Sequence, residues 1–223
     1  MNSLEKEIID CKKCKRLVLF REKIAKIKRK QYIKQSYWGK GVPGFGSFDA
    51  EVLILGLAPA AHGANRTGRV FTGDKSAAFL FKCLYNVGIS NKPNSIEKGD
   101  GLKIFNCYIT CALKCVPPLD KPTKKELSNC LSYFSKEISL LKNLKVILTL
   151  GRVAFETCTN YLQLDKKIYK FSHGANFLIK KNLHLFASYH PSPRNVNTKR
   201  INEDKMNEVF KKIKDVLKPH HNK

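Results

Sequence analysis

The stretch that decides the fold is residues 52–74, VLILGLAPAAHGANRTGRVFTGD. It opens with four apolar residues, Val52 to Leu55, which predict a short strand buried on both faces. At Gly56 the chain enters a long loop rich in glycine and small residues, and a helical pattern follows over residues 75–87. A strand, a loop and a helix in this order form the repeating unit of a parallel sheet covered by helices.

The same order recurs along the chain. Further strands are expected at residues 104–113, 146–150 and 184–189, and helices at 124–141, 152–162 and 203–217, the last closing the chain. The segment 37–46 is so rich in glycine and proline that we expect no regular element there. With 223 residues the chain fits a single domain over 1–223. In a sheet of this kind, ligands bind beyond the carboxyl ends of the strands.

The N-terminal segment 1–35 is helical in character and strongly basic. Leu17, Phe20, Ile24 and Ile27 recur at three- and four-residue steps, which predicts one buried helical stripe. Its positive charges fit either a solvated surface or a contact with DNA. The whole chain has 42 Lys and Arg against 18 Asp and Glu, a net charge of +24, which indicates a polyanionic partner. Nucleic acid is the first candidate and an acidic membrane surface the second.

No signal peptide and no apolar run of membrane-spanning length stand out in the sequence, so we expect an intracellular, cytoplasmic protein. In that reducing setting, its eight cysteines favour metal ligands and buried thiols over disulfides. Four of them, Cys11, Cys14, Cys115 and Cys130, have spacings that can close a tetrahedral zinc site or an iron–sulfur site. The spacing alone leaves both open. The other four, which lie in helical or strand patterns and are expected to be buried, are Cys83, Cys107, Cys111 and Cys158.

Two loops that follow strands carry the chemically distinctive residues. The first resembles a phosphate-binding loop, but Asp74 interrupts the Gly-Lys-Ser/Thr sequence that such a loop needs. It offers instead a carboxylate, the aromatic Phe71 and two arginines, Arg66 and Arg69, a set that suits a base pocket beside a phosphate backbone. The second loop, YHPSPRNVN at residues 189–197, holds His190 extended before a proline and aims it at the crevice.

Together these two loops closely resemble the signature motifs of type B uracil-DNA glycosylases, family 5 of the uracil-DNA glycosylase superfamily. The resemblance also covers residues 37–39, 42–46 and 115–123, and in all it spans Cys11 to Arg200. It implies a three-layer α/β/α sandwich with a central four-stranded parallel sheet. It also implies a structural 4Fe–4S cluster rather than zinc, held by the four cysteines named above.

The resemblance implies an enzyme that flips a deaminated base out of DNA and hydrolyses its N-glycosidic bond, leaving an abasic site. Uracil, hydroxymethyluracil, hypoxanthine, xanthine and ethenocytosine are the bases in question. Asp74 is then the catalytic carboxylate, His190 a donor to the base carbonyl, and Phe71 the ring that stacks on the base. Further substrate-binding residues are expected at Gly56, Ala58, Asp120, Ser192, Arg194 and Asn195. Such an enzyme is expected to act as a monomer.

Two residues depart from the family pattern. Asp120 stands where the family usually has Asn, and Lys199 where it usually has Gly. Leu57 and Ala58 occupy places where related families carry an acidic or amide side chain, so Asp74 has to supply the carboxylate. A uracil-specific type A (family 4) glycosylase is disfavoured, because it would have Glu at the position of Leu57. The alternative hypothesis in which the protein is not an enzyme is a metal-bearing DNA-binding protein without catalytic activity.

Overall fold

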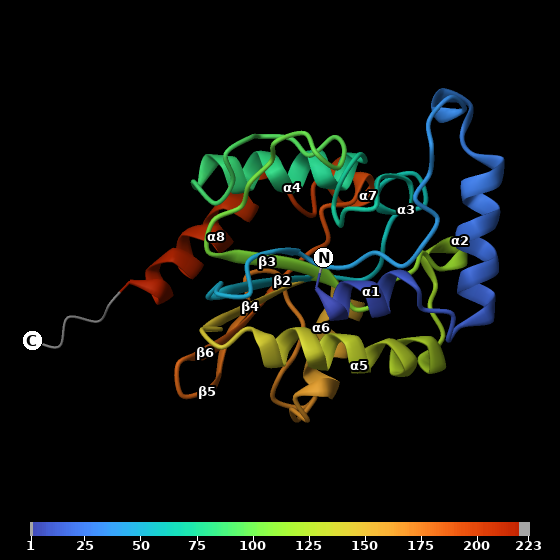
Figure 1. Ribbon diagram of the computed structural model, residues 1–223. Coiled ribbons are helices and arrows are strands. Elements are labelled where there is room, and N and C mark those ends of the chain that lie inside the picture. The colour runs from blue at the N-terminus through green and yellow to red at the C-terminus, as the bar shows by residue number, and fades with distance from the viewer. Residues whose placement is uncertain (1, 219–223) are drawn as a thin grey trace, which may run out of the picture.

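The computed structural model describes residues 2–218 and is a six-stranded sheet with helices on both faces (Figure 1). The strands are β1 (Phe45–Gly46), β2 (Val52–Gly56), β3 (Cys107–Cys111), β4 (Val146–Leu150), β5 (Asn176–Lys180) and β6 (Leu183–Ser188). The α-helices are α1 (Ser3–Ile9), α2 (Lys15–Ile27), α3 (Ala64–Thr67), α4 (Lys75–Asn86), α5 (Lys124–Leu140), α6 (Arg152–Tyr161), α7 (Pro193–Asn197) and α8 (Glu203–Leu217). Short 3-10 helices lie at Lys30–Tyr32 and Pro118–Asp120.

The strand order is β1-β3-β2-β4-β6-β5, and the four central strands are parallel. Leu53 of β2 pairs with Tyr108 of β3 on one side and with Ile147 of β4 on the other. The predicted four-stranded parallel sheet is therefore confirmed. All four carboxyl ends meet at one edge, which places the loops after β2 and β6 close together.

Alternating residues of the central strands face two separate hydrophobic clusters. Ile54 and Leu148 pack with α4 and α8, while Leu53 and Leu55 pack with α5 and α6. Figure 1 shows these two pairs of helices on opposite sides of the sheet. The predicted α/β/α sandwich is present, and the predicted closing helix 203–217 has the same bounds as α8.

Two antiparallel edge strands extend the sheet beyond the prediction. The expectation of no regular element in residues 37–46 was wrong, because Phe45–Gly46 pairs with β3 as the edge strand β1. Gly46 has a φ of +126°, and a Cβ at this position would lie 2.2 Å from the Cys107 carbonyl oxygen, so only glycine allows this close pairing. At the opposite edge, β5 forms a hairpin with β6 and shows alternating exposure typical of a half-buried strand.

The basic N-terminal segment forms two helices rather than one buried stripe. Leu17 is buried, Phe20 and Ile24 are partly buried, and Ile27 is 60% exposed, so the predicted stripe is confirmed in part and is wrong at Ile27. The other buried residue of α2 is Arg21, which is only 2% exposed. Helices α1 and α2 pack through Leu4, Ile8 and Leu17 in a third cluster, which also contains the four candidate metal-binding cysteines.

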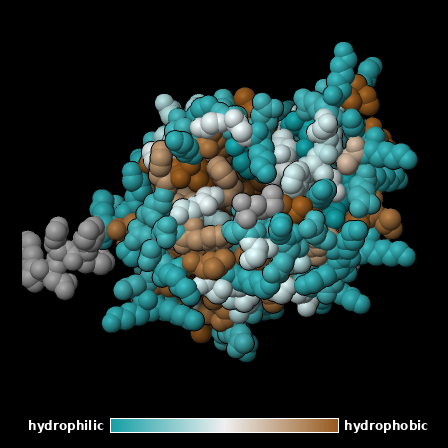
Figure 2. Space-filling model, viewed as in Figure 1, coloured by the Kyte–Doolittle hydropathy of each residue, from teal (hydrophilic) through white to brown (hydrophobic). Residues whose placement is uncertain are grey.

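Helix ends and composition agree with the local sequence. Thr123 and Glu126 form a reciprocal capping box at the start of α5, which satisfies two backbone N–H groups there. No helix within residues 2–218 is both long and apolar enough to cross a bilayer. Teal hydrophilic side chains project around most of the outline in Figure 2, as the high content of lysine and arginine leads one to expect.

Candidate functional site

A cavity of about 490 Å³ opens at the carboxyl ends of β2, β4 and β6. Its wall is built by the first residues after these strands, with α6, the segment before β5 and the loop around α7. The lining residues are Leu57, Leu150, Gly151, Arg152, Val153, Ala154, Phe171, Tyr189, His190, Asn195 and Arg200. The position agrees with the general location of ligand sites in parallel sheets. Of the predicted site residues, His190 and Asn195 lie in this wall.

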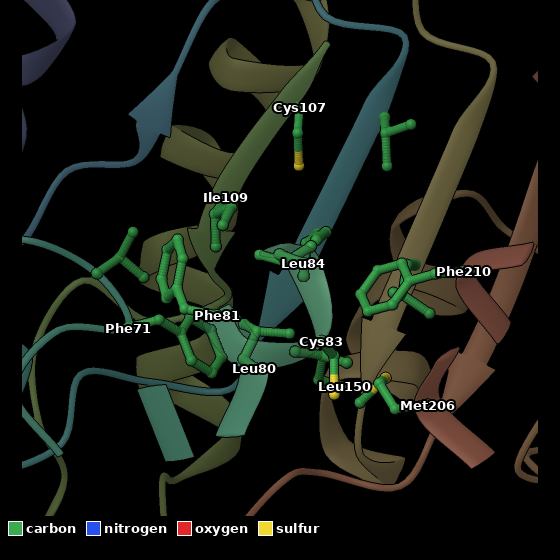
Figure 3. Close-up of a cluster of buried hydrophobic side chains, with 14 of the residues drawn as sticks. Phe71, Leu80, Phe81, Cys83, Leu84, Cys107, Ile109, Leu150, Met206 and Phe210 are labelled. Carbon is green, nitrogen blue, oxygen red and sulfur yellow. The ribbon is translucent and has the colours of Figure 1, made fainter. Parts of the chain in front are cut away.

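Phe71 and His190 come from the two predicted loops and stack on each other. Their ring centroids are 6.0 Å apart with an angle of 29° between the rings. Phe71 is only 8% exposed and belongs to the cluster under α4, where Figure 3 shows it at one end of the buried group and Phe210 and Met206 at the other. A Cβ on Gly56 would lie 2.8 Å from the Phe71 ring, so glycine is needed at the end of β2.

The left-handed backbone of Phe71 is a further sign of a constrained position. Its φ is +46°, a conformation that costs a bulky residue about 1–2 kcal/mol. The buried ring and its packing offset this cost. Strained backbone of this kind clusters at functional sites in proteins generally.

His190 is held uncharged by its surroundings. Burial lowers the pKa of His190 to about 4, so the imidazole is neutral over the physiological range. The Asn195 side-chain amide donates to the His190 carbonyl over 2.9 Å, and the Ser192 hydroxyl accepts from the Asn195 N–H at the start of α7. A Cβ on Gly151 would lie 3.2 Å from the His190 Cβ. Asn195, Ser192 and Gly151 thus fix the loop that presents the imidazole.

Asp74 caps the N-terminus of α4 with one carboxylate oxygen. Its Oδ1 accepts from the Ala77 N–H over 2.9 Å, whereas a Cβ on Gly63 would lie 2.0 Å from Oδ2. Burial raises the pKa of Asp74 above its usual value, opposed by the Ala77 and Ser76 N–H groups and by the positive charge of Arg66. A carboxylate in this setting is partly desolvated, and Gly63 leaves the space that Oδ2 occupies.

The two arginines of the first loop point inward, which corrects the expectation that they flank a phosphate backbone. Arg66 donates to the His62 carbonyl over 2.7 Å and to the Gly73 carbonyl over 2.9 Å, and so ties both ends of the loop together. Arg69 forms a bidentate ion pair with Asp100, with N–O distances of 2.9 and 2.7 Å. Both guanidinium groups are therefore structural partners of the loop that carries Asp74.

The remaining predicted binding residues lie in other settings. Asp120 is exposed in the 3-10 helix before α5, and Arg194 is exposed on α7. Ala58 packs against the cysteine-containing cluster. Lys199 has a φ of +56°, the left-handed conformation that glycine adopts most easily. This backbone conformation gives a physical reason for a glycine at the position, where this chain has lysine.

Sequence reasoning missed two other parts of the cavity wall, Arg152 and Phe171. Arg152 is the first residue of α6, with one residue between it and the end of β4, and lies over the Phe171 ring, with 5.3 Å from the guanidinium carbon to the ring centroid. Its position after a predicted strand was the available signal. Phe171 has no such signal, because it comes from the irregular segment between α6 and β5.

The four cysteines Cys11, Cys14, Cys115 and Cys130 converge in the cluster between α1, α2 and α5. No group of three or more His, Cys, Asp or Glu side chains within residues 2–218 is arranged to hold a single metal ion. The other cysteines, Cys83, Cys107, Cys111 and Cys158, are buried as predicted.

Arg21 is the charged partner of this cysteine cluster. Its guanidinium donates to Cys115 Sγ over 3.0 Å and to the Cys11 carbonyl over 3.0 Å, while its buried Nε has no hydrogen-bond partner among the described residues. The Asn129 amide donates to Cys14 Sγ over 3.3 Å. Four thiols with a buried cation and an unused N–H donor fit a group that carries negative charge and sulfur acceptors, as an iron–sulfur cluster does.

Comparisons with known proteins agree with this geometry. Residues 43–214 match the family described as the uracil DNA glycosylase superfamily. A relative named type-5 uracil-DNA glycosylase from Thermus thermophilus is 43% identical over 92% of both chains. Another of that name, from Pyrobaculum aerophilum, is 40% identical over 92% of this chain and 88% of its own. A type-4 uracil-DNA glycosylase from Sulfurisphaera tokodaii is 31% identical over 97% and 86%. This chain therefore belongs to the uracil DNA glycosylase superfamily.

Proposed function

We propose that this protein is a DNA repair glycosylase that removes uracil from DNA by hydrolysis of the N-glycosidic bond and leaves an abasic site. The observation that carries the proposal is the stacked pair of Phe71 and an uncharged His190 beside the cavity at the carboxyl ends of the sheet. The relatives named type-5 uracil-DNA glycosylase at 38–43% identity support the same activity.

The target base is buried in duplex DNA, so the nucleotide has to be flipped out before it can react. In our proposal the base stacks on Phe71, whose ring lies against that of the cavity residue His190, and His190 donates a hydrogen bond to a base carbonyl oxygen. Negative charge develops on the base as the bond breaks, and a preorganised donor in a dry site stabilises that charge. The low pKa of His190 makes it a neutral donor that does not have to lose a charge on binding.

Asp74 supplies negative charge on the sugar side. The deoxyribose becomes an oxocarbenium-like cation as the base departs, and a carboxylate nearby stabilises this cation or orients the attacking water. Oδ1 is occupied by the α4 N-cap bond, so we assign the chemical role to Oδ2, which lies beside Gly63. Partial desolvation strengthens the interaction between this carboxylate and the developing cation.

A wider choice of bases is part of the proposal. Leu57, which lines the cavity, and Ala58 place no acidic or amide side chain next to Gly56. An apolar wall rejects a misfitting base only weakly, because it leaves no polar group unpaired. We therefore propose that hypoxanthine, xanthine, hydroxymethyluracil and ethenocytosine are also accepted.

We also propose a 4Fe–4S cluster held by Cys11, Cys14, Cys115 and Cys130. When bound, it would act as a structural cross-link between α1, α2 and α5 rather than as a participant in bond cleavage. Arg21 offsets its negative charge and connects it to the active-site loop, since the Asn65 amide of α3 donates to the Arg21 carbonyl over 3.2 Å. Loss of this group is thus expected to loosen the loop that presents Asp74.

The experiment that tests the proposal uses purified protein and oligonucleotides with a single uracil, hypoxanthine or xanthine. After incubation, alkali cleaves the strand wherever a base has been removed. We expect cleavage at uracil and at least one purine lesion, and none at cytosine. Retention of DNA without any alkali-labile site would contradict the proposal and favour a binding protein.

A further inference from the structure

A second cavity, of about 940 Å³, lies between α5, α6 and the segment 166–171. We call it the α5–α6 groove. It shares three lining residues, Arg152, Val153 and Phe171, with the cavity of His190. The two hollows therefore adjoin at the N-terminus of α6, on the side of the sheet where Figure 1 shows α5 and α6. Nothing in the proposed reaction uses this groove.

The rim of the groove is positively charged. Its charged lining residues are Lys124, Arg152, Lys166, Lys170 and the single acid Glu156. All five are exposed, and the Glu156 carboxylate lies 4.0 Å from Arg152. Four cations against one acid attract a polyanion and leave most of the positive charge without a partner in the groove.

Aromatic side chains form part of its floor. Phe171 stacks under Arg152 and meets the ring of Phe155 edge to face, with 5.7 Å between centroids. Tyr169 is partly exposed and rests on Phe177, with 5.3 Å between centroids. Aromatic faces beside a line of lysine and arginine are the combination with which proteins bind single-stranded nucleic acid without sequence preference.

The walls of the groove set the form of the ligand. A cavity of about 940 Å³ lies in the size range of pockets that enclose one small ligand, so it can take a few unpaired nucleotides but not a duplex. We propose that the α5–α6 groove binds a single-stranded DNA segment that leaves the flipped nucleotide, with phosphates on the lysines and bases on Tyr169 and Phe171. This inference rests on the proposed function and extends it to substrates with unpaired flanks.

The test measures binding of wild-type protein to single-stranded oligonucleotides that carry a stable abasic-site analogue and a flank of increasing length on the 5′ or 3′ side. We expect affinity to rise with length on one side only. The variant Lys166→Glu/Lys170→Glu should lose this rise, and its plot of log affinity against log salt should be shallower by about 1.4, at roughly 0.7 per phosphate contact. Tyr169→Leu, which keeps apolar packing on Phe177, should weaken long-flank binding about fivefold or more.

The matched control is Lys180→Glu/Lys181→Glu, which makes the same charge change on the exposed β5–β6 hairpin away from the groove. It should keep the length dependence. Equal losses in both double variants, or no gain with flank length in the wild type, would overturn the proposal. A groove variant that binds every flank as the wild type does would also overturn it and point to a protein segment as the occupant.

Uracil release from the shortest oligonucleotide separates this inference from the proposed function. The groove variant should release uracil from that substrate at the wild-type rate. If the wild type releases no uracil from any substrate, the glycosylase proposal fails. Flank-dependent binding of the abasic analogue still tests, independently of activity, whether the groove binds single-stranded DNA.

Discussion

Replacing Asp74 by Asn separates the two tasks that the structure gives this side chain. Asn keeps a side-chain oxygen for the Ala77 N–H, and Asn and Asp are equally good N-caps. The substitution therefore removes the negative charge and leaves the start of α4 intact. Loss of one preorganised charge-stabilising group costs about 2.7–4 kcal/mol, so we expect the rate of uracil release to fall about 10²–10³-fold.

The free energy of unfolding of Asp74→Asn should differ little from that of the wild type, and the direction of the difference follows from the pKa of Asp74. The pKa of Asp74 is raised in the folded protein, so its carboxyl group favours folding below its unfolded pKa and loses that contribution as pH rises through the folded value. At pH 7 the ionised group is thus at a disadvantage in the fold, and Asp74→Asn should unfold at the same or slightly higher urea concentration. Asp74→Ala is the control, because it also loses the cap and should be destabilised by about 0.5–2 kcal/mol.

The assay is a single-turnover measurement with enzyme in excess over uracil-containing DNA, together with a binding titration on the same DNA. We expect Asp74→Asn to bind DNA as the wild type does and to release uracil slowly. A variant with the wild-type single-turnover rate would refute the assigned role. If Asp74→Asn and Asp74→Ala had equal free energies of unfolding in urea, the side chain of residue 74 would not stabilise α4 as an N-cap.

Three further predictions concern titration, a buried ion pair and the cysteine cluster. The single-turnover rate should fall as pH drops toward the raised pKa of Asp74, while His190 stays neutral until about pH 4; a rate that begins to fall only at the ordinary pKa of an aspartate, about 3.9, would contradict this. In Lys114→Met the buried Glu137 carboxylate keeps the hydrogen bond from the Thr110 hydroxyl but loses its positive partner, which lies 2.7 Å away. This should cost about 3–5 kcal/mol in urea unfolding, most of which Lys114→Met/Glu137→Leu should restore. Arg21→Met should lower the reduction potential of the proposed 4Fe–4S cluster, because a buried positive charge is lost; an unchanged potential in voltammetry would exclude Arg21 as the counter-charge of that cluster.

The sheet was predictable because its strands are continuous apolar runs. The predicted strand 146–150 and helix 203–217 have the bounds of β4 and α8. The edge strands were not predictable in the same way. β1 has two residues in a glycine-rich segment, and β5 half-buries only alternate residues, Phe177 and Ile179, while Leu178 between them is 62% exposed. Edge strands depend on the neighbour they pair with, which the local sequence does not specify.

The site could be predicted where a motif carries it and not where the fold assembles it. Phe71 and His190 were predicted from the two loops, and the structure stacks them. Arg66 and Arg69 were misjudged, because composition says that a loop holds arginines but not which way they point. Phe171 reaches the cavity only through tertiary packing of an irregular segment.

The most direct test of the account is detection of the free base. Purified wild-type protein, Asp74→Asn and His190→Ala would each be incubated with DNA that contains one uracil, and the released base identified by mass spectrometry. The account predicts one free uracil per substrate molecule from the wild type, together with an alkali-labile strand, and release slowed by at least 10²-fold in Asp74→Asn. Wild-type protein that binds this DNA and releases no uracil would contradict it.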